Sequence, residues 1–178
     1  MNQSKIIESN KKISQKIEDE FVELLIQNGF NFATGIPCAT QKDIIKNILE
    51  SNAIDHVIST RESEAFGIAA GAYLAGEKPI VYMQNSGLMN SINDINSLLL
   101  SYKIPILMIV TWRGNAGEDA PQHIINGKIM MKVLRAINIP VQILTKTNMS
   151  KIIKSVTCDM KRRKVPAVIL ITRRALHE

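Results

Sequence analysis

The chain has 178 residues, of which 46% are hydrophobic and 21% are charged, so it is long enough to bury a sizeable core as one ordinary globular domain. Only 4% are aromatic, which favours a sheet covered by helices over an aromatic-rich β-sandwich. The net charge of +6 comes from scattered basic residues without aromatic side chains between them, so we expect a solvated surface and no nucleic-acid groove.

The cysteine and hydropathy patterns favour a cytoplasmic location. Cys38 and Cys158 form no CxxC or metal-ligand pattern, so we expect neither a disulfide framework nor a zinc site. No apolar run approaches the roughly 20 residues that span a bilayer, and residues 1–8 are too polar for a signal peptide. We therefore expect a cytoplasmic protein without a membrane partner.

Helical and strand patterns alternate along the chain. Residues 1–12 are the expected loose lead-in, and residues 13–178 are the expected single domain. Apolar residues at helical spacing and capping signals predict helices over residues 13–28, 40–49, 62–75, 89–102 and 122–138, and from residue 148 onward. Short apolar runs between them predict strands over residues 30–35, 55–59, 79–84, 104–111, 141–144 and 167–172.

Most of these strands are continuous apolar runs, a pattern typical of parallel sheets that are covered on both faces. We predict an α/β fold, doubly wound, with a mainly parallel six-stranded sheet and helices on both faces. Strand-to-helix connections of such a sheet lie at one edge, where open α/β sheets bind ligands. We therefore expect four connections to line a site, namely residues 35–38, 60–62, 85–87 and 112–123.

Glu62 stands where a short strand turns into an Ala- and Gly-rich helix. Ser59 and Glu62 have the spacing of a capping box, and a carboxylate stabilises the N-terminus of a helix. Capping alone is therefore sufficient to explain this acid. Its place on the ligand-binding edge equally favours a role in a site.

Several familiar catalytic motifs are missing from the same edge. The sequence contains no GxGxxG, no P-loop, no GxSxG and no HExxH, so it supports neither a dinucleotide site nor a serine or zinc hydrolase. Cys38 has no neighbouring histidine to activate it, which favours a small buried residue over a nucleophile. His123 either stabilises the loop beside Asp119 or serves the site. Arg113 either binds an anion or pairs with Glu118 or Asp119.

Seven stretches of the chain, which occur in a single order, carry a resemblance to a known family. They are residues 35–38, 61–65, 69–76, 83–88, 90–93, 97–98 and 112–114. The likeness as a whole runs from about residue 15 to 172. These stretches resemble the pyrimidine-binding half of the phosphonopyruvate and sulfopyruvate decarboxylases, which are thiamine-diphosphate enzymes. The resemblance implies a decarboxylase of 2-oxo acids.

The resemblance also implies a role for each candidate residue. Glu62 would be catalytic, because its carboxyl group hydrogen-bonds the aminopyrimidine ring of the cofactor. Pro37 and Cys38 would bind the cofactor ring together with Glu62. The residues expected to face a small anionic 2-oxo acid are Asn85, Ser86, Arg113, Gln122 and His123. Arg113 would neutralise the phosphonate or sulfonate, or only brace the loop. No residue of this chain is expected to bind a metal.

Enzymes of this family also need a diphosphate-binding half, with a Gly-Asp-Gly stretch and an Asn-Asn pair that holds Mg²⁺. No Gly-Asp-Gly occurs here. The resemblance therefore implies an alpha-type subunit that shares thiamine diphosphate with a separate beta-type subunit in a hetero-oligomer, where the partner holds Mg²⁺. Residues 112–114 and 119–123 favour phosphonopyruvate as the substrate, although Ala120 replaces the usual acid. Alternatives are a sulfopyruvate decarboxylase alpha subunit, a non-catalytic binding module, and a subunit for acetolactate-type carboligation.

Overall fold

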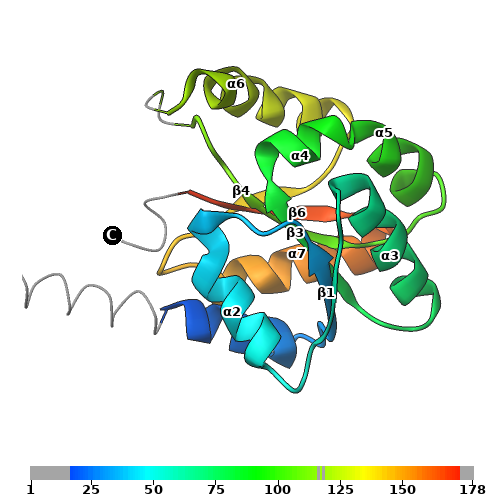
Figure 1. Ribbon diagram of the computed structural model, residues 1–178. Helices are drawn as coiled ribbons and strands as arrows, with labels where there is room; N and C mark the ends of the chain where they lie inside the picture. The colour runs from blue at the N-terminus through cyan, green and yellow to red at the C-terminus, as the bar shows by residue number, and fades with distance from the viewer. Residues whose placement is uncertain (1–16, 116, 118, 173–178) are drawn as a thin grey trace, which may run out of the picture.

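The structure is a computed structural model that describes residues 17–115, 117 and 119–172 (Figure 1). The expected lead-in over residues 1–12 lies outside the described residues, as does Glu118. The described chain forms a six-stranded sheet with the order β2-β1-β3-β4-β6-β5, and every neighbouring pair is parallel. Its strands are β1 Phe32–Gly35, β2 Asp55–Ile58, β3 Pro79–Gln84, β4 Leu107–Thr111, β5 Val141–Ile143 and β6 Ala167–Ile171. The predicted doubly wound parallel sheet is thereby confirmed.

Helices follow each of the first five strands. A first helix covers the described residues 17–27. The others are the 3₁₀ turn η1 Ala39–Gln41, α2 Lys42–Glu50, α3 Glu62–Leu74, α4 Asn85–Asn90, α5 Ile92–Asp94, the π-helical η2 Ile95–Leu100, α6 Pro121–Ala136 and α7 Met149–Arg163. Among the described residues, no helix combines the length and apolar character needed to cross a membrane.

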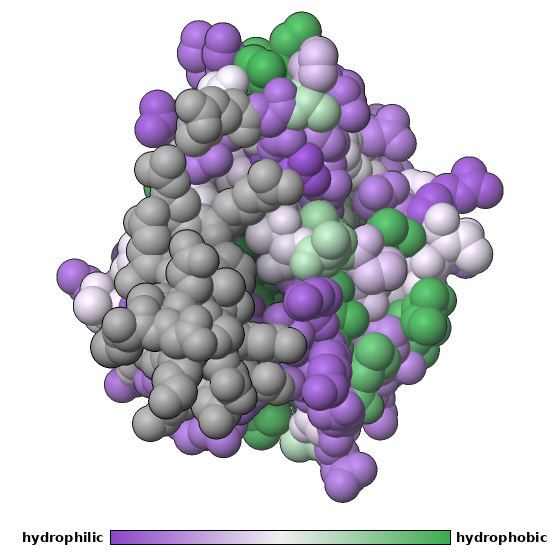
Figure 2. All heavy atoms as spheres, turned by 60° about the vertical axis from the view of Figure 1, so that its left-hand side comes forward, coloured by the Kyte–Doolittle hydropathy of each residue, from purple (hydrophilic) through white to green (hydrophobic). Residues whose placement is uncertain are grey.

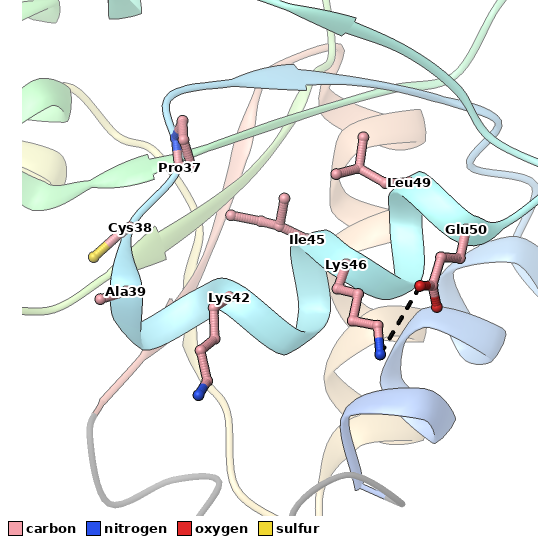
Figure 3. A pocket seen from close by; sticks show the side chains of 8 residues that line it. All are labelled: Pro37, Cys38, Ala39, Lys42, Ile45, Lys46, Leu49 and Glu50. Atoms are coloured by element: carbon pink, nitrogen blue, oxygen red, sulfur yellow. Dashed lines mark ion pairs between the residues drawn. The ribbon is translucent and has the colours of Figure 1, made fainter.

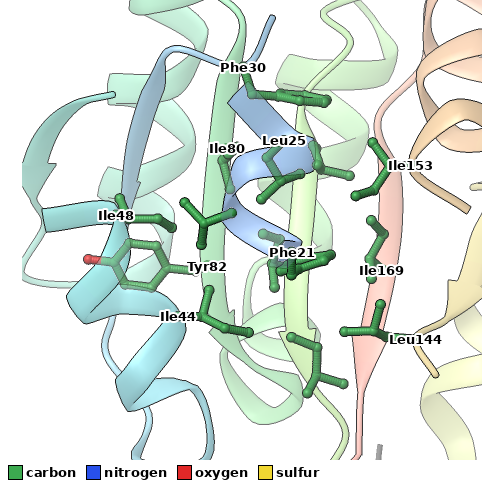
Figure 4. Close-up of a cluster of buried hydrophobic side chains, with 14 of the residues drawn as sticks. Phe21, Leu25, Phe30, Ile44, Ile48, Ile80, Tyr82, Leu144, Ile153 and Ile169 are labelled. Atoms are coloured by element: carbon green, nitrogen blue, oxygen red, sulfur yellow. The ribbon is translucent and has the colours of Figure 1, made fainter. Parts of the chain in front are cut away.

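The two faces of the sheet bury separate hydrophobic clusters, as expected when helices cover both sides. The first helix, α2 and α7 cover one face, where Ile48 lies beside Tyr82 of β3, Ile153 lies beside Ile169 of β6, and Phe21 lies between them (Figure 4). Helices α3, α4 and α6 cover the other face and pack against alternate residues of the same strands (Figure 1). The alternation follows from the two-residue period of a strand.

Strand β2 departs from the expected burial. It lies at the edge of the sheet, and its Val57 and Ile58 side chains are 43% and 71% exposed. On the face drawn in Figure 2, hydrophobic residues are scattered among hydrophilic ones instead of forming one large patch.

The order of the strands fixes the topological switch point. The chain leaves β1 for β2 on one side and then returns past β1 to β3 on the other. Connections that follow β1 and β3 therefore diverge, and the crevice between the carboxyl ends of these two strands is where open α/β sheets bind ligands. The sequence alone did not indicate which connections meet there.

One predicted boundary was wrong in a way that affects the site. The fourth helix was expected to begin near Met89, with residues 85–87 as a loop, but α4 begins at Asn85 directly after β3. Asn85 is buried and bonded to the next connection, so its side chain is held inside the fold instead of favouring an open turn.

Candidate active site

All the predicted site residues follow the carboxyl ends of β1 to β4: Pro37, Cys38, Glu62, Asn85, Ser86, Arg113, Gln122 and His123. The structure joins three of the four connections by side-chain hydrogen bonds and places the fourth against α4. The four connections predicted to line a site therefore contact one another around the end of β3.

Glu62 is the first residue of α3 and lies against the start of α4. It is half-buried, and no described residue forms a hydrogen bond or an ion pair with its carboxylate. Gly87 leaves the space that this carboxylate occupies, because a Cβ atom at Gly87 would collide with Oε1, Cδ and Cγ of Glu62. The acid is thus placed by packing against a glycine and keeps its hydrogen-bonding capacity for another group.

The predicted capping box was wrong. Arg61 is the N-cap of α3 and makes no capping hydrogen bond, and the Ser59 hydroxyl is buried without a partner among the described residues. The carboxylate of Glu64 instead accepts hydrogen bonds from the backbone N–H and the hydroxyl of Thr60, at 2.6 and 2.7 Å. These bonds lower the pKa of Glu64. Glu64 therefore secures the helix start, and Glu62 is not needed for it.

A chain of hydrogen bonds crosses the switch point. The Cys38 thiol, after β1, lies 3.9 Å from Oε1 of Gln84, the last residue of β3. Nε2 of the same Gln84 lies 3.1 Å from Nδ1 of His123 in the first turn of α6. These contacts bring together a predicted cofactor residue and a predicted substrate residue, and they do so through Gln84, which the sequence analysis had not placed among the site residues.

The loop after β4 is held by a second set of contacts. Asn85 is fully buried, and its Nδ2 donates to the carbonyl of Arg113 at 2.9 Å. The Arg113 guanidinium pairs with Asp119 through two hydrogen bonds, one of them 2.7 Å long. Asp119 also accepts from the backbone N–H of Gly114 and of Ala120. This shell of donors, with the Arg113 side chain as its largest contribution, holds the pKa of Asp119 well below its usual range.

Of the two uses predicted for Arg113, the structure shows pairing with Asp119. The hydrogen bonds that Arg113 donates to Asp119 raise the pKa of Arg113, so the pair is fully charged. The His123 ring has no hydrogen bond or ion pair with Asp119 and is hydrogen-bonded to Gln84 instead. The loop is therefore braced by Arg113 and Asp119, and the His123 ring belongs to the chain of contacts that reaches Cys38.

Three of the predicted site residues form no side-chain hydrogen bond with a described residue. Ser86 is half-buried in α4, Gln122 is exposed beside His123, and Pro37 is exposed beside Cys38. Pro37 and Cys38 also form one end of a groove of about 390 Å³ that continues along α2 past Lys42 and Leu49 (Figure 3). The cofactor-ring residues predicted after β1 thus border open space.

Two further residues shape the site and had not been singled out. The buried Gln41 amide, three residues after Cys38, donates to the carbonyls of Ile109 and Met83 at 3.1 and 3.5 Å, which ties η1 to β4 and β3. Gly87 makes room for Glu62. Neither has a sequence signal of its own, because both act through contacts between distant segments.

The donor set favours an organic ligand with hydrogen-bonding groups. Among the described residues, no group of three or more His, Cys, Asp or Glu side chains is arranged to hold a metal ion. The unpaired carboxylate of Glu62 beside Gly87, and the thiol and amide of Cys38 and Gln84 at the ends of β1 and β3, offer both donors and acceptors to a flat ring. The residues present therefore fit the pyrimidine ring of thiamine diphosphate.

Comparisons with known proteins agree with this geometry. Residues 15–133 match the family described as thiamine pyrophosphate enzyme, N-terminal TPP binding domain. The chain is 40% identical to the sulfopyruvate decarboxylase subunit alpha of Methanocaldococcus jannaschii over 147 residues, which cover 82% of this chain and 87% of that protein.

Two other relatives define the breadth of the family. Identity to the sulfopyruvate decarboxylase subunit alpha of Methanococcus maripaludis is 42% over 116 residues, which cover 65% of this chain and 70% of that protein. Identity to the phosphonopyruvate decarboxylase of Streptomyces viridochromogenes is 40% over 102 residues, which cover 57% of this chain and 26% of that protein. The chain therefore belongs to the thiamine pyrophosphate enzymes, as an N-terminal TPP binding domain of the sulfopyruvate and phosphonopyruvate decarboxylase family.

Proposed function

We propose that this chain is the alpha subunit of a thiamine-diphosphate-dependent sulfopyruvate decarboxylase. The observation that carries the proposal is its similarity to sulfopyruvate decarboxylase alpha subunits along most of both chains. The sequence patterns had favoured phosphonopyruvate as the substrate. The comparisons support the sulfopyruvate alternative better, because the phosphonopyruvate decarboxylase is matched over only 57% of this chain.

The proposal includes a partner. A separate beta-type subunit supplies the diphosphate-binding half and holds Mg²⁺, and the cofactor lies between the two chains of a heteromer. Two facts support this division. The relatives matched over most of their length are named as alpha subunits, and the present sequence contains no Gly-Asp-Gly stretch.

When bound, thiamine diphosphate supplies the nucleophilic carbon and the electron sink that decarboxylation of a 2-oxo acid requires. Glu62 would hydrogen-bond a ring nitrogen of the pyrimidine, and Gly87 leaves the space that its carboxylate occupies. Pro37 and Cys38, which line the end of the groove along α2, would border the ring. His123 donates a hydrogen bond to the substrate, while Asn85 holds the Arg113 backbone and Arg113 braces the loop through Asp119.

Other predicted contacts remain part of the proposal with less structural support. Ser86 and Gln122 have no side-chain hydrogen bond to a described residue, which leaves both available to the substrate. Arg113 is already paired, so bracing the loop is the role that its contacts support, and a sulfonate would have to share the guanidinium with Asp119.

The test is co-expression of the chain with a beta-type subunit, followed by measurement of CO₂ release with thiamine diphosphate and Mg²⁺. Sulfopyruvate, phosphonopyruvate and pyruvate are compared at equal concentrations. Faster turnover of sulfopyruvate supports the proposal, and faster turnover of phosphonopyruvate supports the second candidate. A complex that turns over none of the three excludes a 2-oxo acid decarboxylase and favours a binding module or another partner chemistry.

A pair of variants tests the role of Glu62 separately. Glu62→Gln should assemble with its partner and lose most of its turnover, by about 10²-fold or more, as expected for loss of a proton-transfer group. Glu23→Gln removes the same charge from an exposed side chain of the first helix and should retain turnover. Equal turnover in the two variants would contradict the assignment of Glu62.

A further inference from the structure

Gln84 occupies a position between two site residues from different connections. It ends β3, after five buried residues of the same strand, and its side chain is half-buried at the switch point. Oε1 faces the thiol of Cys38 at 3.9 Å, and Nε2 faces Nδ1 of His123 at 3.1 Å. Both ends of one amide are therefore in use.

The two ends of an amide differ chemically. The carbonyl oxygen accepts hydrogen bonds, whereas the NH₂ group only donates them. The Cys38 thiol donates its hydrogen to Oε1, which leaves the NH₂ group of Gln84 facing His123. With the amide in this orientation, the Nδ1 atom of His123 accepts the hydrogen bond. A neutral imidazole carries a single proton, so that proton is on Nε2.

The His123 backbone is fixed independently of the ring. Its N–H donates to the carbonyl of Ala120 at 2.8 Å. Gly114, at a φ of 71°, packs so closely on the His123 carbonyl that a Cβ atom would collide with it. These contacts locate the residue, but the Gln84 amide is the one described side chain that is hydrogen-bonded to the imidazole.

We propose that Gln84 is a positioning residue that fixes the Nε2–H tautomer of His123 and so makes this histidine a hydrogen-bond donor toward the bound ligand. No described residue accepts a hydrogen bond from Nε2. The inference rests on the proposed function in one respect: a sulfonated 2-oxo acid offers only acceptor oxygens, which a donor on His123 would suit. The hydrogen-bond chain itself does not depend on that function.

The experiment reads the tautomer directly. The full chain is prepared with ¹⁵N-labelled histidine rings, and NMR at pH 8 distinguishes protonated from unprotonated ring nitrogens by their ¹⁵N chemical shifts. The chain has three histidines, and a His123→Asn variant identifies the signals of His123. We expect hydrogen on Nε2 and none on Nδ1. Hydrogen on Nδ1 in the unmodified chain would overturn the proposal without any need for a Gln84 variant.

Two substitutions test whether Gln84 is the cause. Gln84→Glu presents only acceptors, so the hydrogen should appear on Nδ1. Gln84→Met has a similar length and no hydrogen-bonding group, so the ring should populate both tautomers. Gln27→Glu, an exposed change of the same kind at the end of the first helix, should leave the His123 signals in place. If folded Gln84→Glu keeps Nδ1 unprotonated, Gln84 does not set the tautomer.

This readout separates the inference from the proposed function, because it needs neither cofactor nor substrate. A complex without decarboxylase activity whose His123 carries hydrogen on Nε2 contradicts the function and retains the positioning role. An active complex whose His123 carries hydrogen on Nδ1 contradicts the positioning role alone.

Discussion

Replacing Glu18 by glutamine should remove a pH-dependent loss of stability from the fold. Glu18 lies in the first helix and is only 2% exposed, and its Oε2 atom has no hydrogen-bond partner among the described residues. Burial, followed by the nearby charges of Asp43 and Asp19, raises its pKa from the ordinary 4.5 to about 7, while Lys42 acts in the opposite direction.

The sign of the effect follows from linkage. The folded state binds the Glu18 proton more tightly than the unfolded state, so the free energy of unfolding is highest below pH 4.5 and falls as the pH rises to about 7. A difference of this size between the two pKa values corresponds to a loss of no more than about 3 kcal/mol. By about pH 8 Glu18 is ionised in both states, and no further loss is expected above that pH.

Urea unfolding between pH 4 and 8 measures this effect, with far-UV circular dichroism and the fluorescence of the single tryptophan as signals. Wild type and Glu18→Gln are compared in the same assembly state. The difference in unfolding free energy should shift in favour of the variant by up to about 3 kcal/mol between pH 4.5 and 8. Glu20→Gln, an exposed change in the same helix, is the control and should follow the wild type. A Glu18→Gln difference that stays constant within about 0.5 kcal/mol would refute the reasoning.

Three other substitutions test the architecture of the site. Gly87→Ala should displace the flexible Glu62 carboxylate, and calorimetry should show weaker thiamine diphosphate binding by the assembled complex with little loss of stability. In Gly35→Ala the added Cβ atom would collide with the backbone of Tyr82 in β3, at a φ of 153° that suits glycine. Thermal unfolding should therefore show a free energy of unfolding lower by about 1–3 kcal/mol. Asp119→Asn should increase protease cleavage of the loop between β4 and α6, because the ion pair with Arg113 is lost. In the wild type this pair should protect the loop at pH 5–8. Its contribution is lost only as the pH falls below about 4, because the pKa of Asp119 is lowered in the folded state.

The fold could be predicted well from the sequence because two independent patterns, the apolar runs of buried strands and the alternation of strands with helices, both indicate a parallel sheet. The apolar run at residues 79–84 coincides with β3, and the alternation of strands and helices dictates a parallel sheet. Local predictions were wrong where a side chain hydrogen-bonds a group other than the one that its local motif would supply. Asn85 was expected in a loop, but it bonds the Arg113 backbone and opens α4. Asn148 precedes α7 as expected, yet its side chain bonds the preceding turn.

The site was predictable only in part. Sequence order places residues on the ligand-binding edge, since every connection after a parallel strand emerges there. It does not reveal which connections touch. The contact of Cys38 with Gln84, and of Gln84 with His123, requires knowing that β1 and β3 are neighbours. The match of Gly87 to Glu62 likewise depends on how α3 and α4 pack.

Two acids at the start of α3 have the two roles that the sequence suggested for Glu62 alone, namely capping the helix and serving the site. Glu64 makes the hydrogen bonds to Thr60 that secure the first turn. Glu62 makes no hydrogen bond to a described residue and lies on the surface of α4 at a glycine. Capping therefore no longer explains Glu62, although the cap fixes the backbone that directs its side chain. The Glu62 carboxylate therefore keeps its hydrogen-bonding capacity for another group. In the proposed enzyme that group is the pyrimidine ring of the cofactor, which the beta-type subunit holds by its diphosphate end.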